Sequence, residues 1–166
     1  MRLIRSLTFL CGFIVCLSTS SIFADLDLVD ITRQKQKAPQ SSYAAIISFE
    51  LEASDEDTVF DKIELSNTGA QVKFNNGIDE VLIYRNTDND TGFNFDTDQN
   101  VGSVSFSSST TGIITIYTTS DPEEEITSGN SELYFVVYKI SDSAELGATT
   151  NLTIEGIYDG SNQIVD

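Results

Sequence analysis

Apolar and polar side chains alternate residue by residue along much of the chain, and this period restricts the fold more than any other feature. Residues 47–53 read Ile-Ser-Phe-Glu-Leu-Glu-Ala, and residues 149–158 repeat the alternation. Successive side chains of a β-strand point to opposite faces, so these segments are typical of strands with one buried face. Turn-forming residues interrupt the pattern about every ten residues, as in sandwiches of short antiparallel strands.

Two segments are apolar almost throughout and predict strands that are covered on both faces. Residues 81–84 read Val-Leu-Ile-Tyr, and residues 133–140 are apolar at nearly every position. Further strands are expected at 59–65, around 72–74, at 104–106 and at 112–117. No segment has a convincing helical period. The sequence therefore predicts an all-β, two-sheet antiparallel β-sandwich, immunoglobulin-like or jelly-roll, with about seven or eight strands.

The N-terminal 24 residues have the three parts of a signal peptide. Residues 1–5 carry two arginines, residues 7–17 are mostly apolar, and residues 18–24 begin with four small polar residues and end in Ala24, although Ile22 is larger than the residue usual three positions before a cleavage site. The apolar run is shorter than the roughly 20 residues that span a membrane. We therefore expect cleavage after Ala24, no membrane insertion afterwards, and a secreted, cell-surface or periplasmic location.

Removal of residues 1–24 changes the composition of the chain in two ways. Both cysteines, Cys11 and Cys16, leave with the signal peptide, so the remaining 142 residues fold without a disulfide. Arg2 and Arg5 also leave, and seven basic side chains then face 26 acidic ones, a net charge of −19. Such a charge repels nucleic acids and anionic lipids. The whole chain has no His, and residues 25–166 have no Cys. This composition excludes Ser-His-Asp and Cys-His catalysis and the usual zinc sites.

Residues 25–42 precede the main domain, which we place at 43–166. Leu26 and Leu28 alternate with acidic residues as in a strand, and a polar stretch with three basic residues then leads to Pro39. Two interpretations are open for this segment. It is either the first strand of its own sandwich, or a donor strand through which residues 25–37 add to the sheet edge of a neighbouring molecule.

One polar segment has residue types that suit a metal ion. Oxygen-bearing side chains recur at alternate positions, and Gly92 permits a bend among them; these side chains belong to Asn86, Asp88, Asp90, Asn94, Asp96 and Asp98. Ca²⁺ prefers six to eight oxygen ligands at ~2.3–2.6 Å, so the segment predicts a structural calcium site. The spacing departs from an EF-hand, because Thr97 stands where a bidentate Glu belongs. The alternative is an exposed acidic loop in which Arg85 neutralises one carboxylate.

The chain resembles exported bacterial and archaeal immunoglobulin-like (cohesin-like) β-sandwich surface modules over residues 43–158. The resemblance rests on Tyr84–Asp98, a strand ending in Tyr followed by an Asp/Asn-Gly calcium-type loop. It rests also on the Tyr-rich strand Leu133–Ile140 and on Ala144-Glu-Leu-Gly147 before the last strand. It implies a non-enzymatic surface or adhesive role with a protein or glycan partner.

Two other functional hypotheses follow from the residues. Assembly through residues 25–37 would make the protein a structural subunit of an extracellular filament or matrix. Paired carboxylates, such as Glu50 with Glu52 or the run at 123–125, would suit a glycoside hydrolase, although they also fit a solvated face. Tyr134 and Tyr138 share one face of a strand, where they either stack on a sugar or pack in the core.

Overall fold

The computed structural model is all-β, and no helix occurs in the residues it describes. These are residues 26–33, 38–67, 77–88, 90–105, 113–119, 123–145, 152–160 and 162–165. Within them, no helix is long and apolar enough to cross a membrane. The strands are β1 (Leu26–Arg33), β2 (Tyr43–Ala53), β3 (Thr58–Val59), β4 (Lys62–Asn67), β5 (Ile78–Arg85), β6 (Gln99–Ser105), β7 (Ile113–Tyr117), β8 (Glu125–Ile126), β9 (Ser131–Ile140), β10 (Leu152–Asp159) and β11 (Asn162–Val165).

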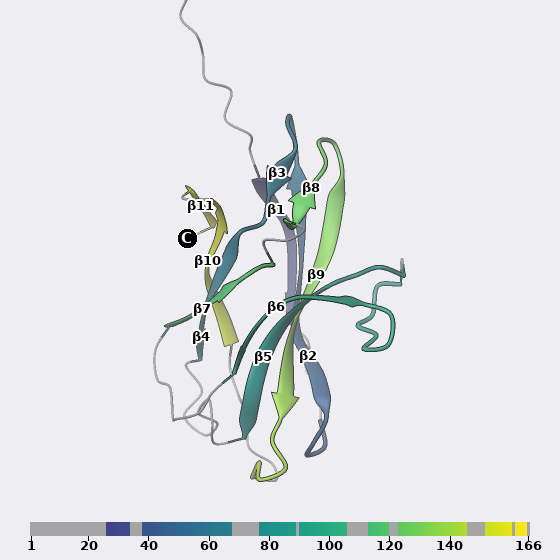
Figure 1. Ribbon diagram of the computed structural model, residues 1–166, viewed down its shortest axis with the longest axis vertical. Helices are drawn as coiled ribbons and strands as arrows, with labels where there is room; N and C mark the ends of the chain where they lie inside the picture. The colour runs from purple at the N-terminus through teal and green to yellow at the C-terminus, as the bar shows by residue number, and fades with distance from the viewer. Residues whose placement is uncertain are drawn as a thin grey trace, which may run out of the picture.

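The strands form two principal sheets that face each other, as Figure 1 shows. The five-stranded sheet has the order β1-β2-β9-β5-β6, and the four-stranded sheet has the order β11-β10-β4-β7. All neighbouring strands are antiparallel, which confirms the predicted fold class. The two short strands β3 and β8 pair with each other as a separate ribbon at one end of the molecule.

The hydrophobic core lies between the two sheets and is built from the inward face of each alternating strand. Ile47, Phe49 and Leu51 come from β2, and Ile63 and Leu65 face them from β4; all are at most 1 % exposed. Burial of each such side chain contributes about 1.5–3 kcal/mol relative to its exposed state. The core is therefore large enough to fold a domain that has no disulfide.

Aromatic rings fill the middle of this core. Tyr134 is stacked on Phe49 with centroids 5.4 Å apart, and Phe60 meets the Tyr134 ring edge-on at 5.0 Å. Tyr134 and Tyr138 are both fully buried. Their predicted alternative role in core packing is therefore confirmed, and neither ring is accessible to a sugar.

At one edge the two sheets approach each other closely through β6 and β7. The Thr119 amide donates to the Val101 carbonyl at 2.7 Å. Val101 belongs to β6 and Thr119 follows the end of β7, so this hydrogen bond joins the two sheets. At Gly102 a Cβ would lie 2.7 Å from the Tyr117 carbonyl oxygen, a separation that real Cβ atoms essentially never show. Glycine is therefore required here because no side chain fits between the two backbones.

The structure corrects the predicted strand at 59–65, which is two strands in different sheets. Val59 ends β3 and Lys62 begins β4, and the two residues between them bond to different neighbours. The Phe60 amide donates to the Glu124 carbonyl at 2.9 Å, and the Asp61 amide donates to the Tyr158 carbonyl at 3.0 Å. Strand β11 was not expected, because Asn162 and Gln163 give it little apolar character. The expected strand around 72–74 lies outside the described residues.

Strand β1 is the first strand of the chain's own sandwich in this structure. It pairs with β2 in antiparallel register, and its Leu26 is 1 % exposed in the core. The register shifts between Leu28 and Asp30, so Val29 forms an irregularity of the bulge type. Val29 and Ile31 are 51 % and 44 % exposed. Residues 1–25 and 34–37, which include the predicted signal peptide, lie outside the described residues.

Candidate functional site

The candidate site begins at β5, whose apolar run at 81–84 is buried on both faces as predicted. Val81 and Ile83 face the core, whereas Leu82 and Tyr84 face the opposite side of the five-stranded sheet. On that side Leu82 and Tyr84 form a second buried cluster with Ala45, Phe135 and Val137. The β5–β6 loop, residues 86–98, extends on this side, away from the four-stranded sheet (Figure 1). An outer face this apolar needs a cover, and the loop supplies it.

Two phenylalanines fasten the loop to the sheet. The Phe93 ring is half-buried, with its centroid 5.1 Å from the Tyr84 ring and 5.8 Å from the Phe135 ring. The Phe95 ring is stacked on Tyr43 at the start of β2, with centroids 4.3 Å apart, and lies 6.1 Å from Tyr84. Pairs at such separations add about 0.5–1.5 kcal/mol each beyond the burial of area. The loop is therefore held against the sheet by its own aromatic side chains.

Tyr43 and Phe95 together form an exposed aromatic surface, which we call the aromatic platform. Their side chains are 37 % and 48 % exposed although the two rings stack on each other. Both residues are anchored, because Tyr43 belongs to a sheet strand and Phe95 to the fastened loop. Large apolar rings that stay exposed on a fixed backbone are typical of interaction surfaces.

Hydrogen bonds centred on Asn94 set the path of the loop. The Asn94 amide nitrogen donates to Asp98 Oδ2 at 2.8 Å, and its carbonyl accepts from the Asp98 amide at 2.9 Å. The Asn94 side chain accepts from the Asp96 amide at 3.1 Å and donates to Asp88 Oδ2 at 3.4 Å. These bonds fix the residues on both sides of Phe95, whose ring is stacked on Tyr43.

Two of the loop carboxylates act as acceptors for neighbouring donors. Asp98 is 7 % exposed and accepts from the Thr87 amide at 3.2 Å as well as from Asn94. Asp88 accepts from the Thr97 hydroxyl at 2.6 Å and from the Asp90 amide at 3.0 Å. The hydrogen bond from Thr97, followed by that from Asp90, lowers the pKa of Asp88 below its ordinary value.

The structure brings some of the predicted calcium ligands together and leaves others apart. Asp88 and Asp98 both contact Asn94, whereas Asp96 reaches Asn94 through its backbone amide. The Asn86 side-chain amide donates to the Asp90 carbonyl oxygen. Among the described residues, no three acidic side chains are arranged to hold a metal ion. Calcium binding by this loop stays a prediction.

Arg85 does not neutralise a loop carboxylate, because it pairs with Glu124 from the segment before β8. Arg85 Nη1 lies 3.1 Å from Glu124 Oε1, and the Tyr134 hydroxyl donates to the same oxygen at 3.0 Å. Glu124 is 3 % exposed, which corrects the solvated-face alternative for this residue, whereas Glu123 and Glu125 are exposed. Burial raises the pKa of Glu124 even though Arg85 opposes the shift.

In both groups of carboxylates considered for hydrolysis, one member binds another side chain of the protein. Glu124 points inward to Arg85, while its neighbours Glu123 and Glu125 are exposed. Glu50 accepts from the Ser131 hydroxyl at 2.5 Å across the β2–β9 pair. Glu124 is therefore engaged in an ion pair within the protein, and Glu50 in a hydrogen bond between two strands.

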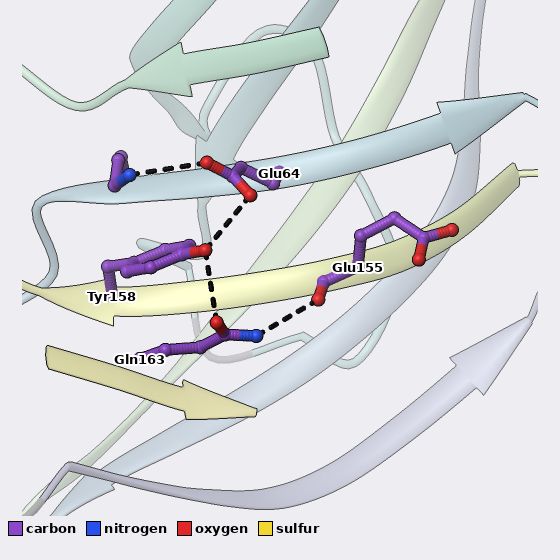
Figure 2. A network of polar contacts seen from close by, with 5 residues as sticks. Glu64, Glu155, Tyr158 and Gln163 are labelled. Atoms are coloured by element: carbon purple, nitrogen blue, oxygen red, sulfur yellow. Dashed lines mark hydrogen bonds and ion pairs between the residues drawn. The ribbon is translucent and has the colours of Figure 1, made fainter. Parts of the chain in front are cut away.

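A second polar cluster ties together β4, β10 and β11 of the four-stranded sheet. The Tyr158 hydroxyl donates to Glu64 Oε2 at 2.9 Å and lies 3.2 Å from Gln163 Oε1 (Figure 2). Gln163 Nε2 in turn donates to the Glu155 carbonyl at 3.2 Å. The Lys62 ammonium lies 3.8 Å from the centre of the Tyr158 ring, a cation–π contact. The donors and acceptors satisfy one another, which is typical of a cluster that stabilises a sheet.

The sequence predicts no functional role for three residues of this site, Tyr43, Phe93 and Phe95. A signal for the two phenylalanines was present, because they stand at alternate positions in a polar loop that follows a strand with two apolar faces. Tyr43 gave no signal, since its contact with Phe95 joins residues far apart in the chain. No family model and no curated protein matches this chain.

Proposed function

We propose that this protein is an exported, non-enzymatic module that binds a protein or glycan partner through the aromatic platform of Tyr43 and Phe95. The observation that carries the proposal is the exposure of two stacked rings on a backbone that is fixed by the sheet and by the Asn94 hydrogen bonds. The signal-peptide pattern of residues 1–24 supports export.

A fixed aromatic surface favours binding for two physical reasons. Aromatic side chains bury a large area with few rotatable bonds, so they lose little conformational entropy when a partner covers them. The stack also holds the Phe95 ring in place before binding, which removes part of the ordering cost. A flexible loop would lose more conformational entropy when it binds.

The contacts of two buried carboxylates support a structural role for these groups and fit a protein that is not an enzyme. Glu124 is bound by Arg85 and Tyr134, and Asp98 by two backbone amides. With no His in the chain, a hydrolase would depend on carboxylate pairs. The proposal keeps a structural Ca²⁺ in the 86–98 loop as a separate prediction, since Asp90 and Asp96 present exposed carboxylates there.

The proposal is tested by binding of the purified protein to arrays of glycans and of peptides. Phe95→Leu keeps an apolar side chain but removes the ring, and Tyr117→Leu is the matched control, because Tyr117 is 65 % exposed on the other sheet. We expect Phe95→Leu to weaken the strongest signals at least about fivefold and Tyr117→Leu to leave them unchanged. Equal effects of the two variants, or no binding by the original protein, would refute the proposal.

A second candidate function, a self-assembling filament or matrix subunit, is favoured by the exposed edge of β1. This strand ends the five-stranded sheet, and Val29 and Ile31 are exposed on it. An edge strand is a template for pairing with another chain, although a bulge such as that at Val29 opposes regular pairing. Assembly would here occur either by pairing with β1 or by exchange of β1 between molecules.

Light scattering coupled to size exclusion tests this second candidate. An assembling subunit would form oligomers whose mass rises with concentration, and Ile31→Lys would prevent their formation. Ile113→Lys is the matched control, because Ile113 is exposed on β7 of the other sheet. A protein that stays monomeric at all concentrations is not such a subunit.

A further inference from the structure

We infer that the partner of the aromatic platform is a basic protein segment, whose Arg or Lys side chains contact the Phe95 ring and pair with exposed carboxylates of the 86–98 loop. This inference rests on the proposed function and names the partner class for the same site. The platform supplies the apolar contact, and the loop that carries Phe95 supplies exposed carboxylates.

The carboxylates of the 86–98 loop have no ion pair with a basic side chain among the described residues. They belong to Asp88, Asp90, Asp96 and Asp98. Asp96 follows Phe95 directly in the chain and is exposed, and its described contact with Asn94 uses its backbone amide and leaves the carboxylate out. A basic side chain of a partner would therefore neutralise, in the calcium-free protein, charge that no described basic side chain compensates.

Lys139, on the strand next to Tyr43, does not compensate the charge of the loop carboxylates. Lys139 is the β9 partner of Tyr43, but its ammonium lies 3.7 Å from Glu80 Oε2 on β5, so that pair is compensated within the sheet. The protein as a whole carries a net charge of −17. Its field attracts cationic segments over a distance of about 8 Å at physiological ionic strength and accelerates their association.

The aromatic rings add a reason to expect a cation at this place. The negative face of a Phe or Tyr ring attracts an ammonium or guanidinium group within about 6 Å, and Arg also stacks its plane on the ring. A neutral sugar would gain from stacking and from hydrogen bonds to the carboxylates, but not from attraction between opposite charges. Ring and charge together therefore favour a basic peptide over a neutral glycan.

The inference is tested with an eight-residue peptide of alternating Arg and Gly and a matched peptide in which Gln replaces each Arg. Binding of labelled peptide to the purified protein is followed by fluorescence anisotropy at ~20 mM and ~150 mM NaCl. Phe95→Leu and Asp96→Asn probe the platform. Tyr117→Leu and Asp142→Asn are the controls, since both are exposed and the second makes the same change in net charge.

The inference predicts binding of the Arg peptide but not of the Gln peptide, weaker at the higher salt concentration. Phe95→Leu and Asp96→Asn should each raise the dissociation constant at least about threefold, and the two controls should leave it unchanged. Equal weakening by Asp96→Asn and Asp142→Asn, with no effect of Phe95→Leu, would mean unspecific charge attraction and overturn the inference. If the peptide does not bind while a neutral glycan binds and loses affinity in Phe95→Leu, the inference fails and the proposed function stands.

Discussion

Asp98 shows how a single buried carboxylate can organise a loop. Its two oxygens accept from the Thr87 and Asn94 amides, which lie near the two ends of the 86–98 loop. Hydrogen bonds to a charged acceptor are stronger than neutral ones. Asp98 therefore performs the closing function that a disulfide performs in many exported domains.

Removal of this carboxylate should destabilise the protein. We expect Asp98→Ala to lower the free energy of unfolding by about 2–4 kcal/mol, because two backbone amides lose a charged acceptor. Asp142→Ala, at an exposed position in a turn, should change it by less than about 0.5 kcal/mol. Urea unfolding measures both values, and similar values for the two variants would contradict the role given to Asp98.

Glu124 is the residue whose titration should be visible in the stability of the fold. Its pKa is raised by burial, against the attraction of Arg85 and the hydrogen bond from Tyr134, while Glu132 raises it further. The folded protein therefore binds more protons than the unfolded chain between the unfolded pKa of ~4.3 and the folded pKa. The stabilisation that this group contributes is complete below that window and is lost as the pH rises through it.

The sign of this effect is checked with Glu124→Gln. The stability of the original protein relative to the variant should fall as the pH rises from ~4 to ~7, because the variant has no carboxyl group to ionise there. Glu123→Gln is the matched charge control at an exposed neighbour. Urea unfolding over this pH range is the measurement. A relative stability that rises with pH would show that attraction to Arg85 outweighs burial.

At the scale of elements, β6 and β7 join the two sheets at an edge where no side chain fits. Gly102→Ala would place a Cβ 2.7 Å from the Tyr117 carbonyl and 3.1 Å from Ile116 Cγ2, so one strand must move. We expect a loss of about 1–3 kcal/mol in the free energy of unfolding. Gly92→Ala is the control, because a Cβ there has no neighbour within 4 Å. Equal losses in the two variants would mean that the edge tolerates a side chain.

The strands could be predicted from the sequence where one face is buried and the chain alternates, as in β2, or where both faces are buried, as in β5 and β9. The break at Phe60 and Asp61 could not, because it depends on hydrogen bonds to Glu124 and Tyr158 from distant segments. The same holds for the burial of Glu124, whose partner Arg85 is far away in the chain. Local pattern carries no information about such long-range pairs.

The candidate site was predicted in part. The oxygen-bearing side chains of the 86–98 loop predict its distinctive chemistry, but they carry no information about Phe93 and Phe95 as a surface. The position of these rings is decided by the apolar outer face formed by Leu82, Tyr84 and their neighbours. That face could be inferred from the two-sided apolar run of β5, whereas the contact with Tyr43 required the three-dimensional fold.

At the scale of the whole molecule, the excess of acidic side chains should make the stability sensitive to salt. The net charge of −17 implies self-repulsion in the folded state, and screening by salt weakens that repulsion. The stability of the protein in CaCl₂ must therefore be compared with its stability in NaCl or MgCl₂ of equal ionic strength. A specific site would add about 2.7 kcal/mol at a Ca²⁺ concentration 100 times the dissociation constant.

Thermal unfolding in CaCl₂ and in MgCl₂ tests the calcium prediction. We expect the melting temperature to be higher in CaCl₂ than in MgCl₂ of equal ionic strength, and to lose this difference in the double variant Asp90→Asn/Asp96→Asn. These two carboxylates take no described part in the Asn94 hydrogen bonds, so their replacement leaves that network intact. Equal melting temperatures in the two salts would contradict the calcium prediction.

The central claim is that partners bind at the aromatic platform, and amide hydrogen exchange locates the contact directly. The exchange of the purified protein would be compared with and without the member of the glycan and peptide arrays that binds most tightly. We predict slower exchange in the bound state at residues 43–45 and 93–97, with no change at residues 113–117 of β7. Protection confined to β7 or to β1, with residues 93–97 unchanged, would contradict the claim.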